Sequence, residues 1–185
     1  MVRQEQVVIR PLGRPGDLGW VVMAHGEVYA AEFGWDTSFE ALVSRIVADY
    51  ATEHDPRRES AWIAEQAGRR VGCVFCVAAD ATTAQLRILL VHPDARGHRL
   101  GARLTDECVR FARAAGYERM RLWTNDPLVA ARGIYLAAGF TLVEQEPHTS
   151  FGVDLVGQVY ELDLRPDAAG RGAAQRRSSP DVPAS

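Results

Sequence analysis

Hydrophobic residues recur at helical spacing in several segments of the chain. The clearest stripe follows Thr37, because Thr37 and Glu40 have the spacing of a capping box and apolar residues then recur every three or four positions up to Tyr50. The same periodicity, with glycine or proline near several of the ends, predicts the other helices. The predicted helices span residues 17–33, 37–50, 101–115 and 127–138.

Short runs rich in β-branched and aromatic residues lie between these helices, and glycine, proline or polar residues bound them, which is typical of strands. Gly68 and Arg69 are expected to form the turn of a hairpin. The order of elements predicts a single α/β unit with a mixed sheet. The predicted strands span residues 6–10, 61–65, 70–77, 86–91, 119–124, 141–146 and 156–164.

The length of 185 residues fits one domain of ordinary size. Hydrophobic residues make up 47% and charged residues 24% of the chain, which is typical of a packed globular protein. Beyond residue 165 the sequence turns to Ala, Gly, Ser, Pro and Arg without periodicity. We therefore expect a domain at residues 1–165 and a disordered tail at residues 166–185.

The basic residues restrict the chemistry, because all 21 of them are arginine. Without lysine the chain can form neither a Schiff base nor a Walker A phosphate loop. The net charge of -3 and the predicted isoelectric point of about 6.0 indicate no nucleic-acid partner and no attraction to an anionic membrane surface. No apolar run approaches the roughly 20 residues needed to span a bilayer.

The first residues and the cysteines predict a cytoplasmic protein. The chain begins Met-Val-Arg-Gln-Glu-Gln, which puts polar and charged residues where a signal peptide would carry its apolar stretch. The chain has an odd number of cysteines, which fits a reducing compartment. Cys73 and Cys76 lie three apart in a predicted strand, so their side chains should point to opposite faces of the sheet. We interpret them as packing residues and expect no metal site.

Residues 91–102 join an apolar strand to an amphipathic helix and contain Gly97 and Gly101. Such a loop directs several backbone N–H groups and the positive end of the helix dipole at one place. Arg96 and Arg99 add positive charge there. The segment predicts a pyrophosphate site, although it lacks the spacing of the dinucleotide fingerprint. A tight turn with solvated arginines is the alternative interpretation.

Two motifs together resemble the cofactor site of the GNAT superfamily of N-acetyltransferases. Residues 96–101, Arg-Gly-His-Arg-Leu-Gly, are similar to the family's loop Arg/Gln-x-x-Gly-x-Gly/Ala, except that Arg99 stands in place of the middle glycine. Arg99 must then turn away from the pyrophosphate or lie alongside it. Tyr135, four residues before the pair Gly139-Phe140, is similar to the family's later helix.

The resemblance covers residues 6–164 and implies a GNAT-like fold. In that fold a central, mixed, twisted sheet is splayed between two parallel strands and flanked by helices, with acetyl-CoA in the split. The resemblance also implies that a backbone N–H of the strand ending at Val91 faces the thioester carbonyl. The cofactor-binding residues that it implies are Leu90, Val91, Arg96, Gly97, His98, Arg99, Leu100, Gly101, Ala102, Asn125 and Tyr135.

By the same resemblance, Tyr135 assists the departing thiolate. A phenol is a weaker acid than a thiol, with pKa values of about 10 and about 8.5, so Tyr135 should help by hydrogen bonding rather than by full proton transfer. A side chain at Gly101 is expected to stand between the helix N-terminus and the pyrophosphate and to leave folding largely unaffected.

The acceptor amine must lose a proton before its nitrogen can attack the thioester. Glu32 is the predicted base, and Asp36, Glu144 and Glu146 are alternatives that could act through water. Each of these carboxylates could equally be a solvated surface group. Aromatic residues that could line an acceptor pocket, or pack in the core, are Tyr29, Trp35 and Phe151.

The predicted function is transfer of an acetyl group from acetyl-CoA to a primary amine, of a small molecule or a protein, by direct attack in a ternary complex. A second copy of the chain is a possible partner. A non-catalytic acyl-CoA-binding regulatory module is the alternative. A narrower similarity, to acetyltransferase domains joined to MarR-type regulators in bacterial proteins, lies in residues 32–36, the helix from Phe39, and residues 86–91 and 150–158. No winged helix is expected here, because the acetyltransferase unit already begins at residue 6.

Overall fold

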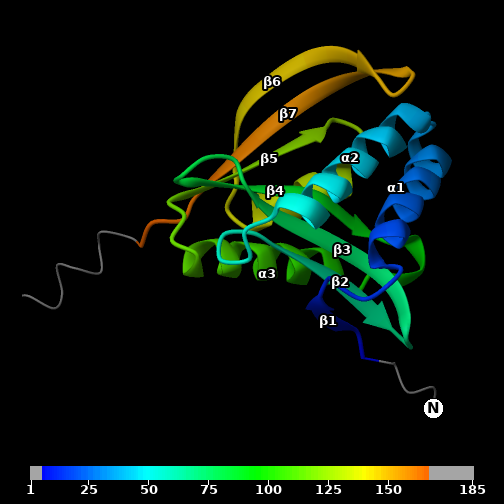
Figure 1. The fold of residues 1–185 in the computed structure, drawn as a ribbon. Helices are drawn as coiled ribbons and strands as arrows, with labels where there is room; N and C mark the ends of the chain where they lie inside the picture. The colour runs from blue at the N-terminus through cyan, green and yellow to red at the C-terminus, as the bar shows by residue number, and fades with distance from the viewer. Residues whose placement is uncertain (1–5, 167–185) are drawn as a thin grey trace, which may run out of the picture.

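Helices cover both faces of one mixed sheet in the computed structural model, which describes residues 6–166 (Figure 1). In spatial order the strands of the described chain are β1 (Val8–Pro11), β2 (Ser60–Gln66), β3 (Arg69–Ala78), β4 (Thr83–Val91), β5 (Arg119–Asn125), β7 (Val153–Asp163) and β6 (Thr141–Ser150). The helices are α1 (Asp17–Phe33), α2 (Thr37–Glu53), α3 (Leu100–Ala114) and α4 (Val129–Ala137). This arrangement confirms the predicted fold class. Most of the predicted tail lies outside the described residues, so the domain limits stay predictions.

Two hydrophobic clusters hold the helices on the sheet. One gathers side chains from α3, α4 and one face of the sheet, and the other gathers side chains from α1, α2 and the opposite face. The stripe on α3 is regular, since Leu104, Cys108 and Ala112 recur at intervals of four residues and are fully buried. The molecule is therefore built of three layers, with the sheet in the middle.

The cysteines confirm the predicted alternation of strand β3. Cys73 packs in the cluster under α1 and α2, and Cys76 packs in the cluster under α3 and α4. Cys108 lies in the latter cluster as well, and all three thiols are free and buried. Burial raises the pKa of the Cys73 and Cys108 thiols well above the ordinary value.

An ion-pair network fixes the start of α1. The carboxylate of Asp17 is fully buried, and it accepts hydrogen bonds from Arg10 of β1 at 2.8 Å and from Arg70 of β3 at 2.7 Å. Arg10 also reaches Glu65 of β2 at 2.6 Å. The helix is thereby tied to three strands at the edge of the sheet.

The parallel strands β4 and β5 separate part of the way along, as the resemblance implies. They pair only from Thr83 to Leu86 on β4, opposite residues 119–122 of β5. A β-bulge follows, because the register between β3 and β4 shifts by one residue and Ile88 has a φ of 44°. From Arg87 to Val91 the edge of β4 toward β5 has no strand partner within residues 6–166.

Two local predictions are wrong. The hairpin between β2 and β3 turns at Ala67 and Gly68, rather than at Gly68 and Arg69, and both turn residues have positive φ, at 52° and 73°. Strand β6 runs to Ser150 instead of ending at residue 146. Pro147 does not end it, because β6 is the edge strand of the sheet and a proline there removes no ladder hydrogen bond.

The added length of β6 and β7 carries their hairpin tip to the junction of α1 and α2 (Figure 1). At this tip the carbonyl of Phe151 accepts a hydrogen bond of 3.0 Å from the backbone N–H of Asp36. The ring of Phe151 packs 4.8 Å from that of Trp35, measured between ring centroids. The tip therefore covers the space that lies beside the split in the sheet.

Candidate active site

A cavity of about 610 Å³ opens where β4 and β5 diverge. Its walls come from the end of β4, from residues 96–102, from α4 and from the last turns of α1. The split sheet thus holds the cleft that the resemblance implies. Of the predicted cofactor residues, those on this wall are Leu90, Val91, Arg96, Gly97, Arg99, Leu100, Gly101 and Ala102.

The first turn of α3 presents unpaired backbone N–H groups at one end of this large cavity. No side chain caps the helix, whose N-cap is Arg99. The N–H groups of a first helical turn have no partner within the helix, so they are free to bind an anion. His98 is absent from the lining residues, and its Nδ1 lies 3.2 Å from the carbonyl oxygen of Arg96.

Arg99 has a backbone conformation that favours glycine, the residue that it replaces in the motif. Its φ is 55°, in the left-handed region that favours glycine, and Gly97 nearby has a φ of 88°. The loop therefore keeps a course that suits glycine, and Arg99 is one of the residues that line the large cavity.

Glu32 pairs with Arg96 on the wall of the large cavity. Arg96 Nη1 lies 2.7 Å from Oε1 of Glu32, and Arg96 Nε also donates to the carbonyl of Val91 at 3.4 Å. The predicted base and the predicted phosphate-binding arginine thus lie together, on the wall of the large cavity.

A smaller cavity of about 100 Å³ adjoins the large one. The two share the side chains of Tyr29, Leu89, Leu128 and Ala131. Tyr135 lines the small cavity although it packs with the α3 and α4 cluster, whereas Tyr29 packs with the α1 and α2 cluster. The small cavity therefore reaches through the sheet at the split.

Tyr135 is 5% exposed. Burial raises the pKa of its phenol well above the ordinary value, and the neighbouring Tyr29 and Cys108 act in the same direction. The hydroxyl is therefore protonated at neutral pH and can act as a hydrogen-bond donor.

Asn125 was predicted to bind the cofactor, and the structure places it on the small cavity instead of the large one. Its Oδ1 lies 2.9 Å from Nε2 of His148, whose Nδ1 lies 2.9 Å from the hydroxyl of Ser150. This chain of contacts links the end of β5 to β6 across the intervening strand β7.

The sequence did not single out two residues of the small cavity, His25 and Arg87. His25 is 1% exposed, and its Nδ1 lies 2.7 Å from the carbonyl oxygen of Val21, one helical turn earlier. Burial lowers the pKa of His25 to about 4. Its spacing from Val21 and Tyr29 on the buried face of α1 was the signal that could have identified it. Of the predicted aromatic residues, Tyr29 and Trp35 line the small cavity.

The alternative bases lie away from both cavities. Asp36 is the N-cap of α2 and accepts a hydrogen bond of 2.9 Å from the backbone N–H of Ser38. Glu144 is exposed and lies 3.2 Å from Arg121, and Glu146 is exposed on the same strand. These carboxylates have structural or surface roles.

The expectation for Gly101 is wrong in part. A Cβ at this position would lie 2.5 Å from Cδ1 of Ile134, so the glycine allows α3 to approach α4. Ile134 itself lines the large cavity. A substitution at Gly101 would therefore disturb helix packing as well as the cavity.

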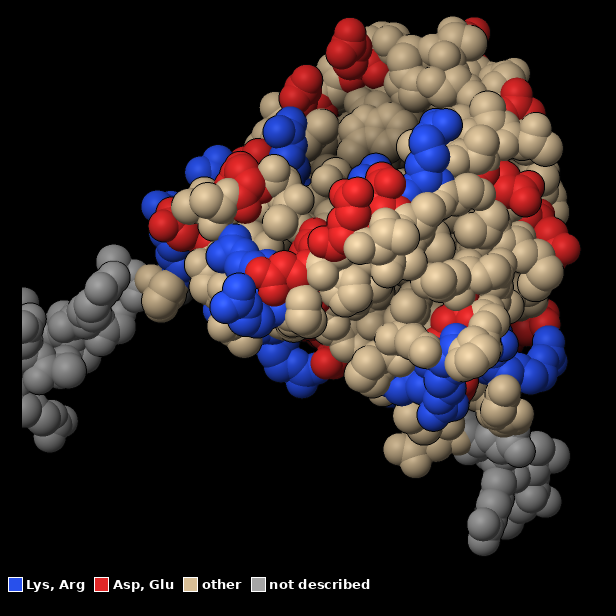
Figure 2. All heavy atoms as spheres, viewed as in Figure 1, with Lys and Arg blue, Asp and Glu red and all other residues tan. Residues whose placement is uncertain are grey.

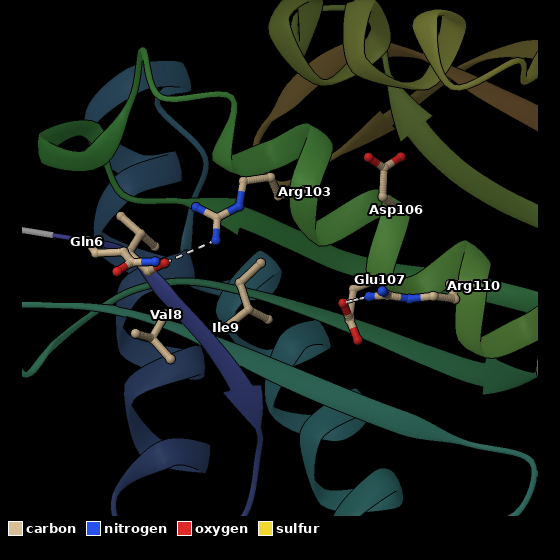
Figure 3. A pocket seen from close by; sticks show the side chains of 8 residues that line it. Gln6, Val8, Ile9, Arg103, Asp106, Glu107 and Arg110 are labelled. Atoms are coloured by element: carbon tan, nitrogen blue, oxygen red, sulfur yellow. Dashed lines mark hydrogen bonds and ion pairs between the residues drawn. The ribbon is translucent and has the colours of Figure 1, made fainter.

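A separate hollow lies between β1 and α3 and has a volume of about 470 Å³ (Figure 3). Three of its polar side chains have partners, since Arg103 donates to the carbonyl of Val7 at 3.0 Å and Arg110 pairs with Glu107. We assign no function to it.

Figure 2 shows arginine and acidic side chains interspersed on the face that it draws. Within residues 6–166, no cluster of three or more His, Cys, Asp or Glu residues could hold a metal ion. None of the described helices has the length and apolar character needed to cross a bilayer.

Solved structures share this fold. A Salmonella typhimurium protein described as an acetyltransferase and solved with its cofactor acetyl-CoA matches with a TM-score of 0.68 and 20% identity, covering 88% of this chain and 96% of that one. An N-acetyltransferase from Staphylococcus aureus Mu50 matches with a TM-score of 0.71 and 18% identity, covering 86% of this chain and 99% of that one.

Sequence relatives agree with the structures. An uncharacterized N-acetyltransferase of Schizosaccharomyces pombe is 27% identical over 149 residues, which are 80% of this chain and 91% of the relative. A mycothiol acetyltransferase of Beutenbergia cavernae is 36% identical over 74 residues, which are 40% of this chain and only 24% of the relative.

Four finer expectations stay predictions. They are the similarity to MarR-linked domains, a bacterial source, a cytoplasmic location and a second copy of the chain as partner. The broader prediction is confirmed, because residues 22–140, more than half of the chain, match the model of the acetyltransferase (GNAT) family. The chain therefore belongs to the GNAT family of N-acetyltransferases, whose members take the acetyl group from acetyl-CoA.

Proposed function

We propose that the chain transfers an acetyl group from acetyl-CoA to a primary amine by direct attack, with donor and acceptor bound together. The observation that carries this proposal is the pair of adjoining cavities at the split between β4 and β5. The large cavity would take the donor and the small one the acceptor. The two meet at Tyr29 and Leu89, where the thioester would lie.

The donor would bind with its pyrophosphate at the first turn of α3. Free backbone N–H groups there, with Arg96 and Arg99, supply the positive charge that a pyrophosphate needs. Beyond Arg87 the edge of β4 lacks a partner from β5, so its backbone groups can bond the rest of the donor. An N–H of this edge would stabilise the oxyanion that forms on the thioester carbonyl.

Tyr135 would donate a hydrogen bond to the departing thiolate. Its position on the small cavity and its protonated, buried phenol support this role. The attacking nitrogen approaches from the small cavity and forms the new C–N bond as the C–S bond breaks. The nitrogen's proton leaves with the base, and the thiolate is released as free CoA once it is protonated.

No covalent acetyl-enzyme is expected. The three cysteines are buried, and none of them lies on the wall of either cavity. A thiol that cannot meet the thioester cannot take up its acetyl group. Direct attack by the amine is then the simpler route.

Glu32 is the proposed base, and its pairing with Arg96 links donor binding to proton removal. A pyrophosphate bound by Arg96 would replace the carboxylate as the partner of the guanidinium. Glu32 would then be released to accept a proton from the amine, directly or through water.

The test is CoA release, measured by thiol detection, across a broad panel of amines with Tyr135→Phe and Tyr160→Phe compared with the unmodified chain. Tyr160 is the matched control, because its ring centroid lies 6.5 Å from that of Tyr135 but its side chain is on neither cavity wall. Tyr135→Phe should lower kcat by about 10²-fold or more and leave acetyl-CoA affinity nearly unchanged. Tyr160→Phe should change neither.

A non-catalytic acyl-CoA-binding module would bind acetyl-CoA and release no CoA with any amine. That result would replace enzymatic transfer with the alternative function. Isolation of an acetylated cysteine during turnover would overturn the direct mechanism and leave the overall reaction standing.

A further inference from the structure

The small cavity has an unusual balance of charge for a site that receives an amine. Among the described residues on its wall, Arg87 is the only arginine, and none is Asp or Glu. The wall therefore carries a cation and no carboxylate. A protonated amine brings a positive charge into this space. The wall itself offers nothing to balance that charge.

Arg87 lies on β4 just before the bulge and faces the helices α1 and α2. Its cross-strand neighbour is Phe75, which packs in the cluster under those helices. The guanidinium makes no hydrogen bond or ion pair with a described residue, although the charge of Asp49 on α2 acts on it from beyond ion-pair distance. A half-buried cation without a partner is costly, and an anionic ligand removes that cost.

Two other polar groups on the same wall lack partners among the described residues. Trp35 is 4% exposed, and its Nε1–H donor has no acceptor. His25 is 1% exposed, and its Nε2 makes no hydrogen bond of full bonding geometry, although the backbone of Ile88 lies near the ring and acts to raise the pKa of His25. The neighbouring carbonyl of Val21 requires a proton on Nδ1 of the neutral ring, so Nε2 carries a lone pair and can only accept.

The wall therefore offers a cation, a buried N–H donor and a buried acceptor, surrounded by aromatic and aliphatic side chains. An amino carboxylate matches all of them. Its carboxylate oxygens would accept from Arg87 and Trp35, and its amine would donate to His25. The rings of Tyr29, Trp35 and Phe39, packed with centroids 4.7 to 5.1 Å apart, would contact an apolar side chain.

We propose that the acceptor of this enzyme is a small amino acid, or a similar amine with a carboxylate, whose apolar side chain packs in the small cavity against Tyr29 and Trp35 while Arg87 binds the carboxylate. This inference rests on the proposed function, because it names the acceptor of the same reaction. It disfavours polyamines and the lysine side chains of proteins, which would bring further positive charge to a wall without a carboxylate.

The experiment compares acceptors in matched pairs that differ only in the carboxylate. The pairs are L-phenylalanine with phenethylamine, L-leucine with 3-methylbutylamine and L-methionine with 3-(methylthio)propylamine, and spermidine serves as a polycation. In at least one pair kcat/KM for the amino acid should exceed that for the amine by about 100-fold or more, as expected when a buried polar site loses the group it binds. Arg87→Gln should reduce this ratio to about 10 or less.

Arg121→Gln is the matched control, because Arg121 is a surface arginine of β5 and lies on neither cavity wall. It should keep the full preference. Equal or better use of the decarboxylated amines or of spermidine would overturn the proposal, and so would a preference for amino acids that survives Arg87→Gln.

A binding measurement separates this inference from the proposed function. The same pairs are added to the chain saturated with CoA, and the melting temperature is measured. The amino acid of a pair should raise it in the unmodified chain and not in Arg87→Gln. If this occurs without acetylation of any amine, the proposed function fails and the binding inference stands. If neither member of any pair binds or reacts, the inference fails.

Discussion

Arg96 Nη1 lies 2.7 Å from Oε1 of Glu32, so the proposed phosphate-binding group and the proposed base neutralise each other in the structure. The pair joins the end of α1 to the loop before α3. Both side chains are partly exposed, which limits what the pair contributes to stability to about 1 kcal/mol or less. Its importance is therefore for ligand binding.

The first prediction is that Glu32→Gln changes acetyl-CoA binding and proton removal in opposite directions. Loss of the carboxylate leaves Arg96 without its competing partner, so acetyl-CoA should bind up to about fivefold more tightly. Loss of the base should at the same time lower kcat by about 10²-fold. Titration calorimetry and steady-state kinetics measure the two effects. Arg96→Gln should show the opposite pattern, with weaker donor binding, and an unchanged kcat in Glu32→Gln would show that another group is the base.

The second prediction concerns Gly133 on α4, which lines the large cavity and where an added Cβ would meet nothing within 4 Å. Gly133→Ala should stabilise the helix by about 1 kcal/mol without harming activity. Gly133→Leu should fold equally well and raise the KM for acetyl-CoA by about tenfold or more, since about 1.4 kcal/mol of binding is a modest loss for an obstructed cavity. A normal KM in the leucine variant would mean that the donor does not pass beside α4.

The third prediction is a pH dependence of stability that comes from His25. Burial lowers its pKa to about 4 in the folded chain, against 6.5 in the unfolded one. Between these values the unfolded chain binds the proton better, so the free energy of unfolding should fall by up to about 3 kcal/mol as the pH decreases from 6.5 to 4. Urea titrations across this range measure it. His25→Gln should be flatter over the same interval, and an equally steep variant would assign the effect to other groups.

The fourth prediction lies at lower pH and concerns Asp17. Burial acts to raise the pKa of Asp17, but hydrogen bonds from Arg10, Arg70 and two backbone N–H groups outweigh it and bring the pKa well below its ordinary value of 3.8. The stability that this carboxylate gives is present above that value and is lost as the pH falls below it.

Asp17→Asn should therefore remove much of the acid unfolding below about pH 4 and destabilise the chain at neutral pH by about 3 to 5 kcal/mol, because it leaves two arginines with one fewer partner. Glu27→Gln, on the exposed face of α1, is the control and should do neither. A neutral-pH stability within 1 kcal/mol of the unmodified chain would contradict the role given to the network.

The sequence predicted the elements well where periodicity and end signals agree. The stripe of α3 and the alternation of Cys73 and Cys76 both follow from spacing, and the structure has them as expected. Pro147 misled the prediction of β6, because a proline ends a central strand but not an edge strand, and the strand order is not visible in a local pattern.

The wall of the large cavity that residues 96–102 form was also predictable, since this loop is one continuous segment. The small cavity was not. His25, Arg87 and Trp35 come from different elements, and each has an ordinary explanation in its own segment: a core histidine, a strand arginine and a core aromatic. Only the packing of α1 and α2 on β4 brings them to one wall and leaves their polar groups without partners.

Because of the bulge at Ile88, the position of the catalytic cleft depends on the number of residues in β4 as well as on their identity. Leu86 and Leu90 would share a face of a regular strand, yet here they pack in opposite clusters, because the extra residue between them reverses the alternation. A chain shortened by one residue at this point could still form the hairpin with β3. It would keep Leu90 opposite Cys73 and beneath α1 and α2, but β4 would lose the local bend that the bulge gives it, and its last part could then continue to pair with β5 where an acetyl donor would bind.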